Sequence, residues 1–349
     1  MFDFPNSPTV GQVVTGGNGA AYQWDGVKWD ASSAITGAAA NNVGRNLIHN
    51  SMFNIWQRGN SFTQLNVRTA DRWSLAVAGA DTVGVALAPL SDTNRTNIGD
   101  EAAKYCMNVN VVGSTGHTYI QQSIEDMRRL AGKTVTVSFW SNADKTLKLG
   151  VNILQSFGSG GSPSAGLWVQ ATGNSVTVGT TFARYSMTFA IPSIIGKTVG
   201  TNGDDYHGLA FWYSVGDGTA PLGGNIGIQS GIINIWGVQL EIGNVMTPLE
   251  KPDPQVDLAN CQRFFFVQTA LTNATFYTGG PGAYFFMDTY FPTMRVVPTV
   301  TTTGAVIQNG SESGWLNGSR NKYEFYVVAN VTAGYVSIAF STISLSADL

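Results

Sequence analysis

Five stretches between residues 134 and 242 alternate apolar and polar side chains. Successive side chains of a strand point to opposite faces, so the alternation predicts strands that each have one apolar face. Glycine- and asparagine-rich segments separate the stretches, as is typical of turns. Such strands bury their apolar faces by packing as two sheets, which predicts a β-sandwich over residues 46–250. The stripes are Val135, Val137 and Phe139; Leu147, Leu149, Val151 and Ile153; Tyr185, Met187, Phe189 and Ile191; Leu209, Phe211, Tyr213 and Val215; and Trp236, Val238, Leu240 and Ile242.

The composition supports an all-β protein and excludes some partners. Charged residues make up 12% of the 349 residues, against about 25% in an average globular protein. The net charge is −3, whereas binding to nucleic acid needs a basic stripe, so no nucleic-acid partner is expected. No apolar stretch approaches the roughly 20 residues that span a bilayer, so no membrane insertion is expected either. Cys106 and Cys261 lie far apart in the sequence and are expected to be buried free thiols.

The first 30 residues form a segment of their own. Asp25-Gly26 between Trp24 and Trp29 predicts a tight hairpin. Because so small a hairpin is not stable alone, Tyr22, Trp24 and Trp29 are predicted to pack on a partner, although packing on the rest of the chain is an alternative. Residues 31–45 are small and polar and are predicted to be a linker.

Two helices are predicted. The spacing of Ile124, Met127 and Leu130, with a glycine at 132, predicts a helix over 124–133 as the one helical stretch of the sandwich. A helical connector, with Pro252 and Pro254 near its start, is expected over 251–263. A C-terminal β-domain is expected over 264–349.

Two segments resemble a known family. Residues 45–73, RNLIHNSMFNIWQRGNSFTQLNVRTADRW, and residues 236–263, WGVQLEIGNVMTPLEKPDPQVDLANCQR, resemble the start and the end of a jelly-roll module of bacteriophage and prophage tail fibres and receptor-binding proteins. The segment around Trp24 also resembles a short N-terminal segment of phage tail proteins. The resemblance implies a jelly roll similar to carbohydrate-binding modules, followed by a distal β-domain, in a homotrimeric fibre.

The same resemblance implies a location and a role. The protein would be made in the host bacterial cytoplasm, consistent with a start that lacks the basic residues of a signal peptide, and would become part of the virion. Its N-terminal hairpin would contact other virion proteins through Tyr22, Trp24 and Trp29. The module would attach the virion to bacterial surface polysaccharide. The alternatives are a structural decoration protein that binds no receptor and a polysaccharide-degrading tailspike.

Aromatic residues are the candidate sugar contacts, because flat rings stack on the apolar side of a pyranose. If Phe139 and Phe211 face the core, Trp140 and Trp212 face outward on an outer sheet face. An oligomer interface or an overlying loop would bury the same rings. In the distal domain, Trp315 is expected in a long exposed loop over 310–322. Tyr284, Phe285, Trp315 and Tyr323 together form a second candidate surface.

Candidate catalytic and metal-binding residues are few. Asp204 and Asp205, next to Tyr206 and His207, form the acid pair best placed for polysaccharide cleavage or for polar contacts to a sugar, although a solvated turn is the favoured interpretation. The histidines have no zinc-binding spacing, so no enzyme activity, metal site or cofactor is predicted. A calcium ion at Asn46, Asn50 and Asp71 is an open alternative suggested by sugar-binding jelly rolls in general.

Overall fold

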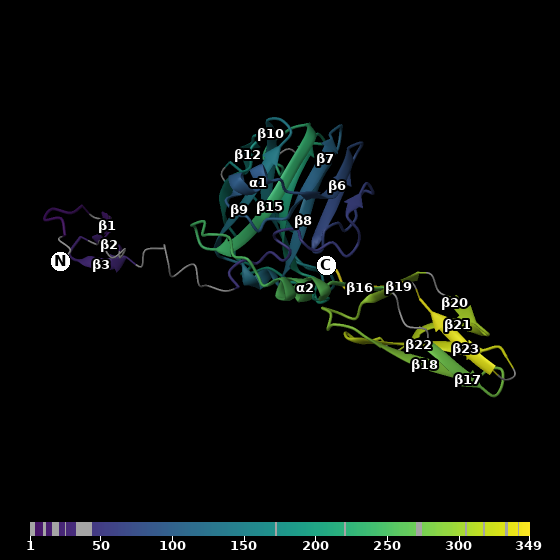
Figure 1. The fold of residues 1–349 in the computed structure, drawn as a ribbon. Coiled ribbons are helices and arrows are strands. Elements are labelled where there is room, and N and C mark those ends of the chain that lie inside the picture. Colours follow the sequence, from purple (N-terminus) through teal and green to yellow (C-terminus); the bar gives the residue numbers. More distant parts are fainter. Residues whose placement is uncertain are drawn as a thin grey trace.

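The protein is all-β apart from short helices, as the sequence predicts (Figure 1). The structure is a computed structural model. It describes residues 4–9, 12–15, 21–24, 26–32, 44–171, 173–219, 221–269, 274–303, 306–316, 318–331, 334–340 and 342–349. An N-terminal hairpin segment, a central sandwich, a helix and a C-terminal β-domain follow one another along the chain.

Two six-stranded antiparallel sheets form the sandwich. The β14 sheet has the order β11-β10-β14-β8-β5, with β12 also paired to β10, and the β15 sheet has the order β13-β9-β15-β7-β6-β4. The strands of the two sheets together are β4 (Ser61–Phe62), β5 (Trp73–Ala78), β6 (Thr82–Pro89), β7 (Tyr105–Val112), β8 (His117–Glu125), β9 (Thr134–Ala143), β10 (Leu147–Ser156), β11 (Leu167–Val169), β12 (Ser175–Val178), β13 (Ala183–Ala190), β14 (Tyr206–Val215) and β15 (Ser230–Ile242). The main core combines residues from both sheets, which confirms that the sheets pack face to face.

Most of the predicted stripes lie in this core, but two are interrupted by β-bulges. A register shift follows Trp212 in β14, so Val215 packs outside the main core. A second shift lies between Trp236 and Gln239 in β15, where Gly237 has φ +62°. The predicted common face of Trp236 and Val238 is therefore wrong, because the extra residue turns Trp236 to the outer face. Ile242, at the end of the same stripe, is also exposed.

The predicted helix over 124–133 is wrong. Strand β8 continues to Glu125, which pairs with Tyr206, and only a 3₁₀ turn over Met127–Arg129 follows. A different helix was missed, α1 (Asp92–Ile98), which the Ser91 side chain caps by accepting from the Asn94 N–H. The connector helix is confirmed as α2 (Pro254–Gln262).

The N-terminal segment is a three-stranded sheet of β1 (Val13–Thr15), β2 (Ala21–Trp24) and β3 (Trp29–Ser32). Trp24 pairs with Trp29 across the predicted hairpin. Phe4 stacks on Trp29 and meets Tyr22 edge-on, with ring centroids 5.2 and 5.0 Å apart. The half-buried aromatic residues thus pack on one another. Most of the predicted linker, 33–43, lies outside the described residues.

The C-terminal domain consists of three antiparallel sheets with three strands each, in the orders β16-β24-β19, β17-β23-β20 and β18-β22-β21. The strands are β16 (Phe265–Thr269), β17 (Ala274–Thr278), β18 (Tyr284–Tyr290), β19 (Thr299–Thr303), β20 (Val306–Gln308), β21 (Gly310–Leu316), β22 (Lys322–Ala329), β23 (Gly334–Ala339) and β24 (Thr342–Ser346). The sheets share a core of their own. Trp315 lies in strand β21, so the predicted long loop is wrong.

Two further expectations can be checked. Both cysteines are buried and free. Among the helices of the described ranges, none has the length and apolar character needed to cross a membrane.

Candidate functional site

On the outer face of the β14 sheet, Trp212, which sequence analysis linked to sugar binding, lies in a group of aromatic residues. Trp212 of β14 lies directly opposite Tyr119 of β8, and their ring centroids are 4.5 Å apart. Trp168, on edge strand β11, meets Trp212 edge-on at 5.5 Å and Tyr119 at 6.0 Å. Trp212 therefore lies at the centre of an aromatic cluster, flanked by Tyr119 and Trp168.

Trp212 itself cannot stack on a sugar in this structure. It faces away from the main core, as predicted, but its exposed fraction is only 1%. Of the interpretations offered for this ring, burial under an overlying loop is the correct one, because Leu222 and Ile226 of the following loop pack over it. Its indole N–H donates to the Asn152 side chain, whose amide donates in turn to the Leu222 carbonyl at 2.6 Å.

Glycines allow this loop to lie close to the sheet. A Cβ on Gly150 would come within 2.2 Å of the Gly223 carbonyl oxygen, so a larger residue would displace the loop. His117 pairs with Asp217 at the start of the loop, and its ring lies 5.4 Å from that of Trp212. The half-buried Tyr119 and Trp168 are therefore the members of the cluster that reach the surface.

A polar groove lies next to the cluster on the same sheet. It has a volume of about 310 Å³, and its lining includes Ser74, Gln121, Ser123, Tyr206 and Arg68. Burial, together with the nearby Tyr206 hydroxyl, raises the pKa of Tyr119. The Tyr119 hydroxyl thus remains protonated at neutral pH. This face combines ring surfaces with amide and hydroxyl groups, which is the combination that sugars require.

Trp140 lies on the opposite side of the sandwich from Trp212. It belongs to β9 of the β15 sheet and contacts Trp236 edge-on at 5.4 Å. The Arg184 guanidinium covers its ring at 4.4 Å and donates to the Thr247 carbonyl. The structure therefore does not bring Trp140 and Trp212 together on one face, and it leaves Trp140 only half-exposed.

The acid pair at 204 and 205 stabilises turns. The Asp204 carboxylate accepts from the Ser159 N–H and hydroxyl, at 2.7 and 2.5 Å, and these bonds lower its pKa. Asp205 accepts from the Met127 N–H at 2.9 Å, across the 3₁₀ turn. Both carboxylates are engaged by protein donors, in agreement with the turn interpretation.

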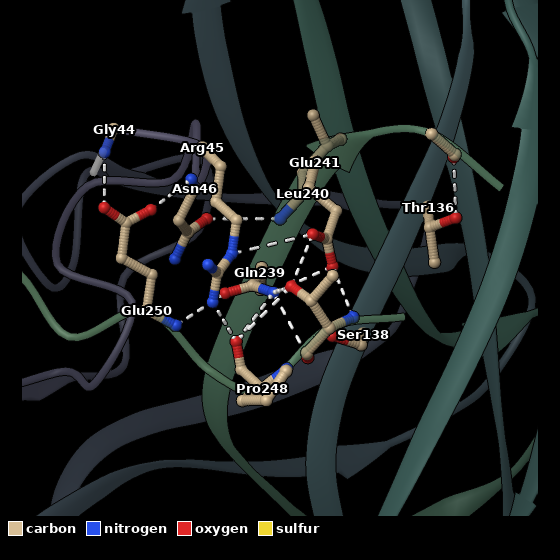
Figure 2. A network of polar contacts seen from close by, with 12 residues as sticks. Gly44, Arg45, Asn46, Thr136, Ser138, Gln239, Leu240, Glu241, Pro248 and Glu250 are labelled. Carbon is tan, nitrogen blue, oxygen red and sulfur yellow. Dashed lines mark hydrogen bonds and ion pairs between the residues drawn. The ribbon is translucent and has the colours of Figure 1, made fainter. Parts of the chain in front are cut away.

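The residues that carry the family resemblance connect the two ends of the sandwich (Figure 2). The Glu250 carboxylate accepts from the Gly44 and Asn46 N–H groups. The Asn46 side chain accepts from the Leu240 N–H and donates to the Val238 carbonyl. The entering segment is thus bonded to the strand and loop by which the chain leaves.

Glu241 is the centre of the second half of this network. Its carboxylate accepts from Gln239 at 2.8 Å and from the N–H and hydroxyl of Thr247 at 3.0 and 2.6 Å. The Arg45 guanidinium lies 3.7 Å away and donates to the Pro248 carbonyl (Figure 2). The motif WGVQLEIG…TPLE is therefore structural in this protein.

Residues of the segment 45–73, the first of the two segments that resemble the phage module, contact the C-terminal domain. Gln57 donates to both Asp71 and the Phe265 carbonyl. Arg58 lies 3.6 Å above the Phe265 ring and pairs with Asp348. The segment that contains TADRW and the C-terminal residues of the chain therefore contact each other directly.

A second set of arginines completes this junction. Arg72 lies 3.2 Å above the Phe264 ring and donates to the Ser123 carbonyl. Glu125 at the end of β8 pairs with Arg263 after α2. The Arg295 guanidinium lies 4.0 Å from the same Glu125 carboxylate. Charged residues are few in this chain, and several of them are placed where the sandwich, α2 and the C-terminal domain meet.

The suggested calcium ligands are occupied by protein hydrogen bonds. The Asn46 oxygen accepts from the Ile48 N–H, the Asn50 oxygen accepts from Ile55, and Asp71 accepts from Gln57. In the described part of the chain, no three acidic, histidine or cysteine side chains are grouped as metal ligands. The structure gives the calcium suggestion no support.

Sequence analysis missed Tyr119, Trp168 and Gln121 as candidate contacts. The alternation in HTYIQQSIE could have predicted two of them, because Tyr119 and Gln121 flank the buried Ile120 and therefore point to the other face of the strand. Trp168 belongs to a strand of only three residues, which has too few positions to show a period. The Trp315 side chain lies outside the described part of the structure. Tyr22 and Trp24 lie in β2 and Trp29 lies in β3 of the hairpin sheet.

Comparisons with known proteins give similar solved structures only. No family model and no curated protein matches the chain. A tailspike protein 4 enzymatically active domain of bacteriophage CBA120 matches with a TM-score of 0.35 and 16% identity, over 57% of this chain and 22% of the tailspike. A family 11 carbohydrate-binding module from Clostridium thermocellum matches with a TM-score of 0.31 and 11% identity, over 54% of this chain and 98% of the module. A xylan-binding domain from Paenibacillus barcinonensis matches with a TM-score of 0.30 and 8% identity, over 53% of this chain and 94% of the domain.

Proposed function

We propose that this protein is a phage virion protein, a tail fibre or head-attached fibre, that attaches the particle to bacterial surface polysaccharide through the outer face of the β14 sheet. The observation that carries the binding proposal is the position of Tyr119 and Trp168, two half-buried rings beside the polar groove at Gln121 and Tyr206. A chain of pyranose rings stacks on such rings, and the groove supplies hydrogen bonds to its hydroxyl groups.

The virion role is carried by the sequence resemblance. In this proposal the hairpin that holds Tyr22, Trp24 and Trp29 contacts other virion proteins. The fibre is a homotrimer, so that several weak sites act together on one bacterial surface.

The binding experiment uses the purified full chain and a panel of bacterial surface polysaccharides. We expect Tyr119→Ala and Trp168→Ala each to weaken binding about tenfold, which corresponds to roughly 1.4 kcal/mol. Tyr105→Ala is the matched control, because Tyr105 is an exposed aromatic residue of the β15 sheet. Equal binding by all variants would contradict the site.

Release of reducing ends is measured in the same samples. Binding without release agrees with an attachment protein. Cleavage would instead support a polysaccharide-degrading tailspike, and Asp204 and Asp205, whose carboxylates accept hydrogen bonds from Ser159 and Met127, would be the first residues to substitute. Failure to bind any polysaccharide of a broad panel would support a purely structural decoration protein.

A further inference from the structure

A cavity lies where the start of the sandwich, the segment after β15 and helix α2 meet. It has a volume of about 610 Å³, and its lining comes from the segments 44–49 and 248–253, from α2 and from Arg129 of the 3₁₀ turn. Arg45, Asn46 and Glu250 of the network in Figure 2 are part of this lining. Ligand pockets have volumes of about 300–1,000 Å³, so this cavity, which we call the α2 pocket, is large enough for a small molecule.

Asp257 of α2 is buried, and one of its oxygens is an unused acceptor. Its exposed fraction is 4%, and its Oδ1 atom accepts from the Asn50 N–H at 2.8 Å. The other carboxylate oxygen has no hydrogen-bond partner in the described part of the chain. Burial raises the pKa of Asp257, because it disfavours the charged form. Buried polar groups are normally hydrogen-bonded, so the unused oxygen indicates a ligand that donates to it.

The His49 ring adds a second buried polar atom without a partner. The His49 main chain is fixed to β8, because its N–H donates to the Gln122 side chain at 2.8 Å and its carbonyl accepts from that side chain at 2.9 Å. The ring nitrogen Nδ1 is buried and has no partner among the described residues. Burial lowers the pKa of His49 to about 3, and the nearby Arg129 is one of three arginines that act in the same direction. The ring is therefore neutral at neutral pH and presents one hydrogen-bond donor and one acceptor.

Arg129 gives the α2 pocket an uncompensated positive charge. Its side chain is exposed, and no ion pair or hydrogen bond engages it within the described ranges. The other two lining cations, Arg45 and Lys251, each lie beside a carboxylate of the protein. The carboxylates of Glu250 and Asp253 accept from main-chain N–H groups. A ligand with one negative charge at Arg129 therefore complements the pocket.

A neighbouring cavity extends the α2 pocket and contains an aromatic ring. It has a volume of about 420 Å³ and shares Pro252 and Asp257 with the α2 pocket. The half-buried Trp56 lines it, and the Trp56 ring stacks on Phe62 with centroids 6.3 Å apart. Aromatic rings pack against the apolar side of sugars, so a ligand that extends from the α2 pocket meets a second surface suited to a sugar ring.

We propose that the α2 pocket binds an acidic sugar, a hydroxylated ring that carries one carboxylate or phosphate group. The acidic group pairs with Arg129, while hydroxyl groups of the sugar donate to the unused oxygen of Asp257 and bond to the His49 ring. The apolar side of the sugar packs on Ile48 and Val256, which also line the pocket. A polyphosphate is a poorer occupant, because three carboxylates line the same pocket and repel additional negative charge. This site is separate from the face around Tyr119, and the inference does not depend on polysaccharide binding there.

Ligand-observed NMR titrations of the purified full chain test this site. The probes are glucuronate, glucose 6-phosphate, glucose and inorganic phosphate. We expect glucuronate or glucose 6-phosphate to bind about tenfold more tightly than glucose, because hydrogen bonds to charged groups are the stronger ones. Comparison of the two acidic sugars distinguishes a carboxylate ligand from a phosphate ligand. Inorganic phosphate should bind about tenfold more weakly than the acidic sugar, because it lacks the hydroxyl contacts to Asp257.

Two variants and a matched control assign the binding to this pocket. Arg129→Gln should remove the preference for the acidic sugar over glucose. Asp257→Asn should weaken the binding of both, and the substitution keeps a carbonyl oxygen for the Asn50 N–H. Arg128→Gln is the control, because Arg128 is an exposed residue of the same 3₁₀ turn that does not line the pocket, and it should bind as wild type does.

Several outcomes would overturn the inference. They are failure of both acidic sugars to bind, equal binding of the acidic sugars and glucose, inorganic phosphate that binds as tightly as the acidic sugar, and an Arg129→Gln variant that keeps the wild-type preference. Tyr119→Ala should leave these titrations unchanged, although it weakens polysaccharide binding. If Tyr119→Ala instead abolishes binding of the acidic sugar and Arg129→Gln does not, the ligand binds to the β14 sheet and the α2 pocket is refuted, while the proposed function is supported.

Discussion

At residue 207, a histidine side chain is fully enclosed in strand β14, and neither ring nitrogen has a hydrogen-bond partner in the described part of the chain. Burial lowers the pKa of His207 from 6.5 to about 4, although Asp126 and Asp205 act in the opposite direction. The unfolded chain therefore takes up a proton at this residue as the pH falls through 6.5, and the folded chain does so only near 4. The contribution of the neutral His207 ring to the free energy of unfolding is therefore fully present above pH 6.5, and it is lost as the pH falls from 6.5 to 4.

We expect His207→Phe to reduce this pH dependence. The shift corresponds to about 3 kcal/mol over the whole window, and an apolar ring removes the titrating group without leaving an unpaired nitrogen. The measurement is the free energy of unfolding in urea at pH 7 and pH 5. The difference between the two pH values should be smaller for the variant than for wild type by roughly 2 kcal/mol. An unchanged difference would show that other groups, such as the half-buried His49, dominate the acid response.

The site residues show how far a strand pattern can predict function. Alternation placed Trp212 outside the main core correctly, because Phe211 faces inward. It left burial under an overlying loop open as an alternative, but it could not identify the loop that contains Leu222 and Ile226, since loop position depends on contacts between distant segments. Tyr119 became a candidate only when pairing of β8 with β14 placed it beside Trp212.

At the scale of elements, the sequence predicted strands better than their irregularities. The alternation in 134–140 and 147–153 matches buried residues of β9 and β10. The bulge at Gly237 was missed because one extra residue leaves the surrounding composition unchanged while it reverses the face of Trp236. The turn at 127–129 was mistaken for a helix because its apolar spacing also suits a strand that ends in a buried turn.

Helix α2 was predictable from its first residues, and these give an element-scale test. The Asp253 side chain caps the helix by accepting from the Gln255 and Val256 N–H groups, and Pro254 suits the first turn. We expect Asp253→Ala to lower the free energy of unfolding by about 1 kcal/mol. Gln255→Ala, at an exposed position of the same turn, is the control and should change stability by less than about 0.5 kcal/mol. A loss of equal size in both variants would contradict the capping role.

At the scale of the whole molecule, the connection between the sandwich and the C-terminal domain has the clearest consequence. Glu125 of the sandwich pairs with Arg263 after α2 and lies near Arg295 of the C-terminal domain, and all three side chains are partly accessible to water. Figure 1 shows the C-terminus returning to the sandwich, where Asp348 pairs with Arg58. These contacts connect the C-terminal domain to the sandwich at two places.

We expect Glu125→Gln to loosen this connection without unfolding the sandwich. Partly exposed ion pairs contribute about 0.2–1 kcal/mol, so hydrogen exchange of the amides in α2 and β16 should become roughly two- to fivefold faster. High salt should bring the wild type towards the variant, because it screens the same pairs. Asp92→Asn removes the exposed pair with Arg95 on α1 and should leave exchange in α2 unchanged. If Glu125→Gln leaves the exchange rates and their salt dependence as in wild type, the other contacts of the junction are sufficient, namely the Phe264 and Phe265 rings under Arg72 and Arg58 and the Arg58–Asp348 pair.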